Sequence, residues 1–202
     1  PEVPDIPIWQ GDEAQGRAVA SIVGCTHDWF GGWTGYDAGD PDLFLTEDLQ
    51  GGRLAGVLAH EAPCILVGHW PGFYFGGEET GFAVLKEVKR RLDRYDPDGS
   101  KTIWMKTSAI GHYWMARRLS TITSAPLGNG ANEITIKTRF PTGNFTLWLD
   151  RPAAYVACNG QPLRQVYDRS TFGEGDFLVE RAQTALAIDL AEGVTRIQIL
   201  FA

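Results

Sequence analysis

The sequence has little cysteine and no long apolar run, and both shortages exclude classes of protein. Its three cysteines, Cys25, Cys64 and Cys158, are too few and too scattered for a disulfide framework or a zinc knuckle. No stretch of about 18 consecutive apolar residues exists, so we expect no membrane-spanning segment and no membrane partner. The first ten residues, PEVPDIPIWQ, lack the basic and apolar segments of a signal peptide. The compartment therefore stays open, with secretion or a periplasmic location among the alternatives.

Basic charge is also scarce. Eighteen Lys and Arg stand against 25 Asp and Glu, and the net charge of -7 argues against nucleic acid as a partner, because phosphate binding needs a basic face. Basic residues crowd only the stretch 86–94, where interleaved acidic residues indicate a solvated helix face. The chain has no H-x-x-x-H or C-x-x-C pair and no G-x-S-x-G elbow. Neither a complete zinc site nor covalent catalysis by Ser or Cys is predicted.

Apolar and aromatic residues are plentiful and predict a folded protein. Hydrophobic residues make up 44% of the chain, with seven Trp and ten Phe. Residues 1–118 alternate short apolar runs with helical patterns, which is typical of an α/β layer. Residues 119–202 show short alternating runs separated by turn residues, which is the all-β pattern. We expect two domains with these bounds, an α/β domain followed by a small β-sandwich.

The α/β domain has three predicted strands, at 17–23, 64–67 and 102–105. Helices are predicted at 46–62, at 79–95 and from Thr107 or Ser108 onward, because apolar residues recur there at helical spacing behind capping residues. Right-handed crossovers between parallel strands are the architecture that this order favours. In the second domain the predicted strands are 133–140, 145–149, 154–158, 177–181, 185–190 and 196–201.

Chemistry is predicted first at His69, which follows the apolar run 64–67. Ligands bind at the carboxyl ends of strands in α/β sheets, and a histidine with a pKa near neutrality can protonate a leaving group there. The neighbouring Trp70 and Tyr74 offer flat ring faces to a sugar. A hydrogen-bonded packing role for His69 is the alternative.

The second candidate region is the glycine-rich loop 24–42, which follows the first predicted strand and is expected to open on the same rim. It carries Asp28, Trp29, Trp33 and Tyr36. Aromatic rings stack on the C–H faces of sugars and carboxylates accept hydrogen bonds from hydroxyls, so we take the three rings as candidate sugar contacts and Asp28, with His69, as a candidate catalytic residue. The alternative is a loop that folds its aromatic side chains inward as a small core.

The run ILVGHWPGFY, the helix ETGFAVLKEVKRRLDRY and the segment TIWMKTSAIGHYW together resemble the closing part of polysaccharide deacetylase-like proteins. The resemblance covers residues 65–114 and implies a late strand of a (β/α) barrel ending in His69, the general acid toward the leaving amine. The family's early aspartate pair and H-x-x-x-H metal motif have no match in this chain. The chain therefore looks like the carboxyl-terminal part of such a barrel with a β-sandwich appended, and a divalent metal such as zinc would need ligands from outside it.

A partial barrel leaves a bare sheet edge, which another polypeptide is expected to cover. The amino-terminal part of the same precursor, or a second copy of the chain, would serve, and Pro1 in place of Met fits a fragment or a processed product. The expected function is a carbohydrate-active hydrolase acting on a polysaccharide or oligosaccharide. The first alternative is a non-catalytic carbohydrate-binding protein that uses the same aromatic rim. A second is sugar binding by the β-sandwich through Trp148, Tyr155 or Tyr167.

Overall fold

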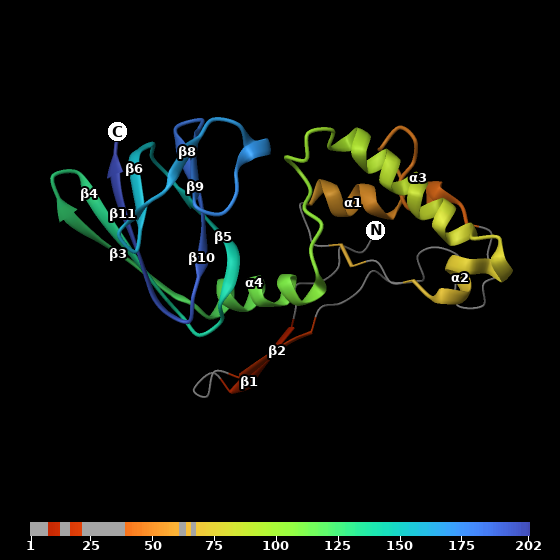
Figure 1. The fold of residues 1–202 in the computed structure, drawn as a ribbon, viewed down its shortest axis with the longest axis horizontal. Coiled ribbons are helices and arrows are strands. Elements are labelled where there is room, and N and C mark those ends of the chain that lie inside the picture. The colour runs from red at the N-terminus through yellow and green to blue at the C-terminus, as the bar shows by residue number, and fades with distance from the viewer. Residues whose placement is uncertain (1–7, 13–16, 22–38, 61–63, 66–67) are drawn as a thin grey trace. The chain divides into compact units, whose positions relative to one another are not determined.

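A computed structural model of the chain describes residues 8–12, 17–21, 39–60, 64–65 and 68–202 (Figure 1). Contacts divide the chain into two compact units. The helical unit contains the described residues between 39 and 104, and the β unit contains residues 8–12, 17–21 and 105–202. The predicted domain boundary between residues 118 and 119 stays a prediction.

The helical unit contains helices α1 (Arg53–Ala59), α2 (Trp70–Tyr74) and α3 (Thr80–Tyr95), with short 3-10 turns at Pro41–Leu43 and Phe75–Gly77. Helix α3 forms where the sequence predicts it, because one side of its surface is apolar. Its Val84 and Val88 pack in a small core with Phe44, Leu45 and Leu54. No helix among the described residues is long and apolar enough to cross a membrane.

Two predicted elements of this unit are shorter than expected or missing. The helix predicted at 46–62 begins only at Arg53, because Thr46 closes a turn instead of capping a helix, its hydroxyl accepting a hydrogen bond from the Gly51 amide at 2.8 Å. Gly52 then turns the chain at φ +85°, where a Cβ would meet the Phe44 carbonyl at 2.5 Å. These contacts hold the segment before Arg53 in turns, so the helix begins later in the chain than the sequence predicts.

The strand predicted at 102–105 is wrong. These residues form no strand, and Ile103 and Trp104 are 82% and 66% exposed. None of the described strands pairs with this run, and Asp96 instead accepts hydrogen bonds from the amide and hydroxyl of Thr102 at 2.7 and 2.8 Å. Of the strand predicted at 64–67, residues 64 and 65 are not in a strand and the other two lie outside the described residues.

The β unit is built on two mostly antiparallel sheets, and helix α4 (Thr107–Leu119) packs at one end of them (Figure 1). One sheet has the order β3 (Thr121–Gly128), β4 (Ala131–Thr138), β11 (Gly193–Phe201), β6 (Ala153–Cys158) and β7 (Gln161–Pro162). The other has the order β5 (Thr142–Leu149), β10 (Gln183–Leu190), β9 (Asp176–Glu180) and β8 (Arg164–Val166). A short 3-10 turn at Arg169–Thr171 lies between β8 and β9.

The inner faces of the two sheets share one core, as in a β-sandwich. Alternate residues of β11, such as Ile197 and Ile199, meet Leu186 and Ile188 of β10, and all four are at most 2% exposed. Helix α4 contributes Ala116, with Tyr113 packed against the cluster. The six strands predicted for residues 119–202 are confirmed within three residues at each end.

The described part of residues 1–118 shows no barrel closure. Its strand β2 (Arg17–Ser21) confirms the strand predicted at 17–23 over those five residues, but it pairs antiparallel with β1 (Ile8–Asp12) as a hairpin. The only parallel pair among the described strands is β8 with β9, which lies in the sandwich. The mixed helical and β-rich class is therefore confirmed, while the parallel pairing expected of a barrel is not found in the described residues.

Candidate functional site

Three of the predicted site residues, His69, Trp70 and Tyr74, lie together at α2. Four others, Asp28, Trp29, Trp33 and Tyr36, lie outside the described residues. Of the rim predicted around His69, the structure therefore describes the segment from His69 to Tyr74.

Helix α2 is a single turn, fixed at both ends by backbone geometry. His69 has extended dihedral angles at its start, and its carbonyl accepts hydrogen bonds from the amides of Gly72 and Phe73 at 3.0 and 3.1 Å. Pro71 favours this turn because its ring fixes φ in the helical range. Phe75 ends the turn at φ +43°, donating its amide to the Pro71 carbonyl. The segment thus presents successive aromatic side chains from a short, constrained turn.

The rings of Trp70 and Tyr74 form an exposed pair, which we call the α2 aromatic pair. Their centroids are 5.6 Å apart and their planes are inclined by 33°. The two side chains belong to residues that are 68% and 49% exposed. Exposed aromatic surface of this kind marks sites of interaction, because water solvates it poorly.

Two phenylalanines support the pair from the protein side. The Phe82 ring on α3 meets the Tyr74 ring edge-on at 5.5 Å and lies 5.0 Å from the Phe73 ring. The Phe73 ring in turn packs so closely on Gly68 that a Cβ there would approach it to 2.6 Å. The sequence places Phe82 on the apolar stripe of α3, and its role beneath Tyr74 is visible only in the structure.

His69 is half-buried beside the α2 aromatic pair. Within the part of the chain that the structure describes, no group of three or more His, Cys, Asp or Glu side chains is arranged to hold a metal ion. These residues do not fit the zinc centre that the deacetylase resemblance implies, so no metal-dependent step is derived for them.

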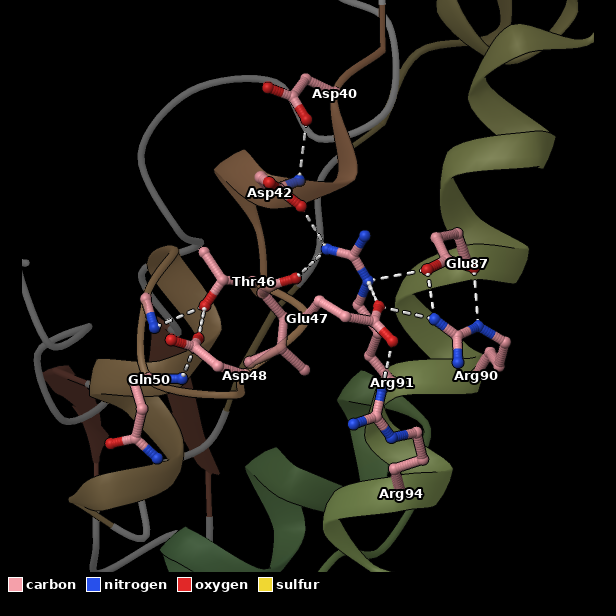
Figure 2. Close-up of polar contacts among 12 residues, drawn as sticks. Asp40, Asp42, Thr46, Glu47, Asp48, Gln50, Glu87, Arg90, Arg91 and Arg94 are labelled. Atoms are coloured by element: carbon pink, nitrogen blue, oxygen red, sulfur yellow. Dashed lines mark hydrogen bonds and ion pairs between the residues drawn. The ribbon is translucent and has the colours of Figure 1, made fainter.

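The basic stretch of α3 is neutralised by carboxylates, as Figure 2 shows. Glu47 pairs with Arg90 and Arg91 at 2.6 and 3.0 Å and also with Arg94. A hydrogen bond from Arg90, with further contributions from Arg91, lowers the pKa of Glu87 to about 2. The solvated face predicted for this stretch holds for Arg90 and Arg94, which are about half exposed, but not for Arg91, whose side chain is 8% exposed.

Arg91 is buried, and the Nε and Nη1 atoms of its guanidinium are paired with acceptors. It pairs with Asp42 at 2.5 Å and Glu87 at 2.7 Å, and it donates to the Leu45 carbonyl at 2.5 Å. The Arg91 contacts join α3 to the turn at Pro41–Leu43 and to the buried Leu45. This network therefore holds the helix on the segment before α1 and serves the fold of the helical unit.

Comparison with protein-family models, with curated proteins and with solved structures gives no match for this chain.

Proposed function

We propose that the chain binds carbohydrate through the α2 aromatic pair. The observation that carries this proposal is the exposure of Trp70 and Tyr74 side by side on one constrained turn. A sugar ring presents a face of C–H groups that packs on an aromatic face, and the buried area gives a favourable free energy. Because Phe73 packs against the Trp70 ring and Phe82 against the Tyr74 ring, the two side chains have little conformational freedom left to lose on binding.

Calorimetric titration of the full chain with cellohexaose, xylohexaose and chitohexaose tests this proposal. We expect saturable binding of at least one of them, and Trp70→Ala should weaken it about two- to tenfold, since an aromatic contact contributes roughly 0.5 to 1.5 kcal/mol beyond its area. Trp104→Ala is the matched control, because Trp104 is 66% exposed but lies outside α2. Absence of binding to all three sugars, or equal loss in both variants, would contradict the proposal.

A hydrolase of the polysaccharide deacetylase-like group is the second function that we propose. Its support is the position of His69 directly before Trp70, which puts an imidazole next to the α2 aromatic pair. Metal ligands would have to come from outside the chain, from the amino-terminal part of the same precursor or from another copy. A histidine in this position would hold a proton for the leaving amine.

Acetate release from N-acetylated chito-oligosaccharides separates the two proposed functions. If the chain is a hydrolase, His69→Ala should abolish acetate release without weakening sugar binding. His60→Ala is the control, because His60 is an exposed histidine that contacts its own helix at the Gly56 carbonyl, 2.7 Å away. Sugar binding without acetate release, with zinc added, would leave the binding function and refute the hydrolase.

A further inference from the structure

A hollow of about 450 Å³ lies within the β unit, and no residue of α2 lines it. It opens between the beginning of α4, the start of β5 and the end of β10. Its apolar lining comes from Met105, Ala109, Pro141 and Leu190, and its polar lining from His112, Thr142, Asn144 and Asp189. This volume lies within the range of pockets that hold small molecules.

Asp189 is placed at the hollow by an irregularity in the sheet. Strand β10 pairs Ile188 with Phe145 and Leu190 with Thr142, so two residues of β5, Gly143 and Asn144, lie opposite the single Asp189. Such bulges redirect side chains and are common beside functional sites.

The backbone of the bulge holds the Asp189 carboxylate in place. The backbone amide of Asn144, a residue with φ +51°, donates a hydrogen bond to Asp189 Oδ1 at 2.9 Å. A Cβ at Gly143 would lie 3.3 Å from the same oxygen, so a residue with a side chain would crowd it. The carboxylate is thus fixed at the wall of the hollow before any ligand arrives.

A second carboxyl group, that of Glu174, interacts with Asp189. Hydrogen bonding to Asp189 and repulsion between the two groups raise the pKa of Glu174. None of the residues that line the hollow is Lys or Arg. The polar lining therefore includes the negative charge of Asp189, while Met105 and Leu190 supply apolar lining.

We propose that this hollow binds a small organic cation, with a primary ammonium group at Asp189 and an aliphatic body along Met105 and Leu190. An ammonium group has three donors for the acceptor-only carboxylate, and the charge-assisted bond is stronger than a neutral one. An anionic ligand would face the Asp189 carboxylate with no Lys or Arg in the lining to offset it. The described residues around the hollow also form no set of three metal-binding side chains, so a metal ion is not the occupant that they favour.

Calorimetric titration of the full chain at pH 7 with n-pentylammonium tests the proposal. We expect saturable binding with one site per chain and at least tenfold weaker binding of 1-pentanol, which has the same body without the charge. Asp189→Asn should weaken pentylammonium binding at least tenfold. Glu192→Gln, which removes an exposed carboxylate from the turn between β10 and β11, should leave it unchanged.

A second variant keeps the test decisive if Asp189→Asn disturbs the bulge. Ala109→Phe places a ring in the hollow from α4 and leaves both carboxyl groups intact, and it should also abolish binding. Circular dichroism confirms that each variant is folded. Failure of pentylammonium to saturate, equal binding of 1-pentanol, binding that survives in folded Asp189→Asn, or preferential binding of Ca²⁺ would overturn the proposal. Sugar titrations are independent of this result, because Trp70 and Asp189 lie in different units.

Discussion

Removal of the Arg91 side chain should destabilise the helical unit far more than removal of its neighbour Arg90. In Arg91→Ala the carbonyl of the buried Leu45 loses its donor, and Asp42, Glu47 and Glu87 lose the cation that they share. Breaking a buried ion pair from one side costs about 3 to 5 kcal/mol. Here the carboxylates are 29% to 58% exposed and can be rehydrated, so we expect a loss of about 2 to 3 kcal/mol in the free energy of unfolding.

Amide hydrogen exchange of the full chain, read by mass spectrometry, measures this loss in α3 separately from the β unit. Exchange from the α3 amides should accelerate about 30- to 150-fold in Arg91→Ala, as 2 to 3 kcal/mol implies, while the strands keep their protection. Arg90→Ala is the control on the same helix, because its side chain is 49% exposed and water can replace it at Glu47 and Glu87. Equal acceleration in the two variants would show that burial does not determine how much Arg91 stabilises the helical unit, and it would refute the reasoning.

Three further changes test the packing and electrostatics of each unit. Leu186→Ala, which leaves a cavity at a fully buried position of β10, should lower the free energy of unfolding of the β unit by about 2 to 5 kcal/mol in urea titration. Thr184→Val should lower the free energy of unfolding of the β unit by about 1 to 3 kcal/mol. The buried Thr184 hydroxyl accepts a hydrogen bond from the Ala153 amide at 2.8 Å and donates one to the Arg151 carbonyl at 2.9 Å, and both groups would lose this partner. The pKa of Glu87 is lowered from 4.5 to about 2 in the folded chain. The contribution of Glu87 to stability is therefore present above pH 4.5 and is lost as the pH falls toward 2. A urea midpoint for the helical unit that does not fall between about pH 5 and pH 3 would contradict this.

Strands and helices with a periodic apolar face were predictable from the sequence. The spacing of Phe82, Leu85 and Val88 predicts α3, and alternation predicts β6 to within one residue of its observed bounds. Strand β3 was missed because it lies at the edge of its sheet, where all eight residues are exposed and no alternation of apolar and polar residues is required. Pro126 within it also argues against a strand at the level of sequence.

The candidate site was predictable in part. The sequence brings His69, Trp70 and Tyr74 together because they are neighbours in the chain, and the structure shows that the two larger rings are exposed and supported by Phe82. The hollow beside α4 could not be predicted. Asp189 reaches it through a shift in strand register, which depends on the pairing of residues more than 40 positions apart.

The sequence alone determined the composition of each part, the periodic elements and the presence of aromatic residues beside His69, because these depend on neighbours in the chain. Tertiary structure decided which of the three arginines near the end of α3 is buried. Arg90, Arg91 and Arg94 lie within two turns of one helix, yet only the side chain of Arg91 turns onto Leu45 and Asp42 and leaves the solvent. Tertiary structure likewise left the apolar Ile103 and Trp104 without strand pairing, since a strand forms only where another strand supplies its hydrogen bonds.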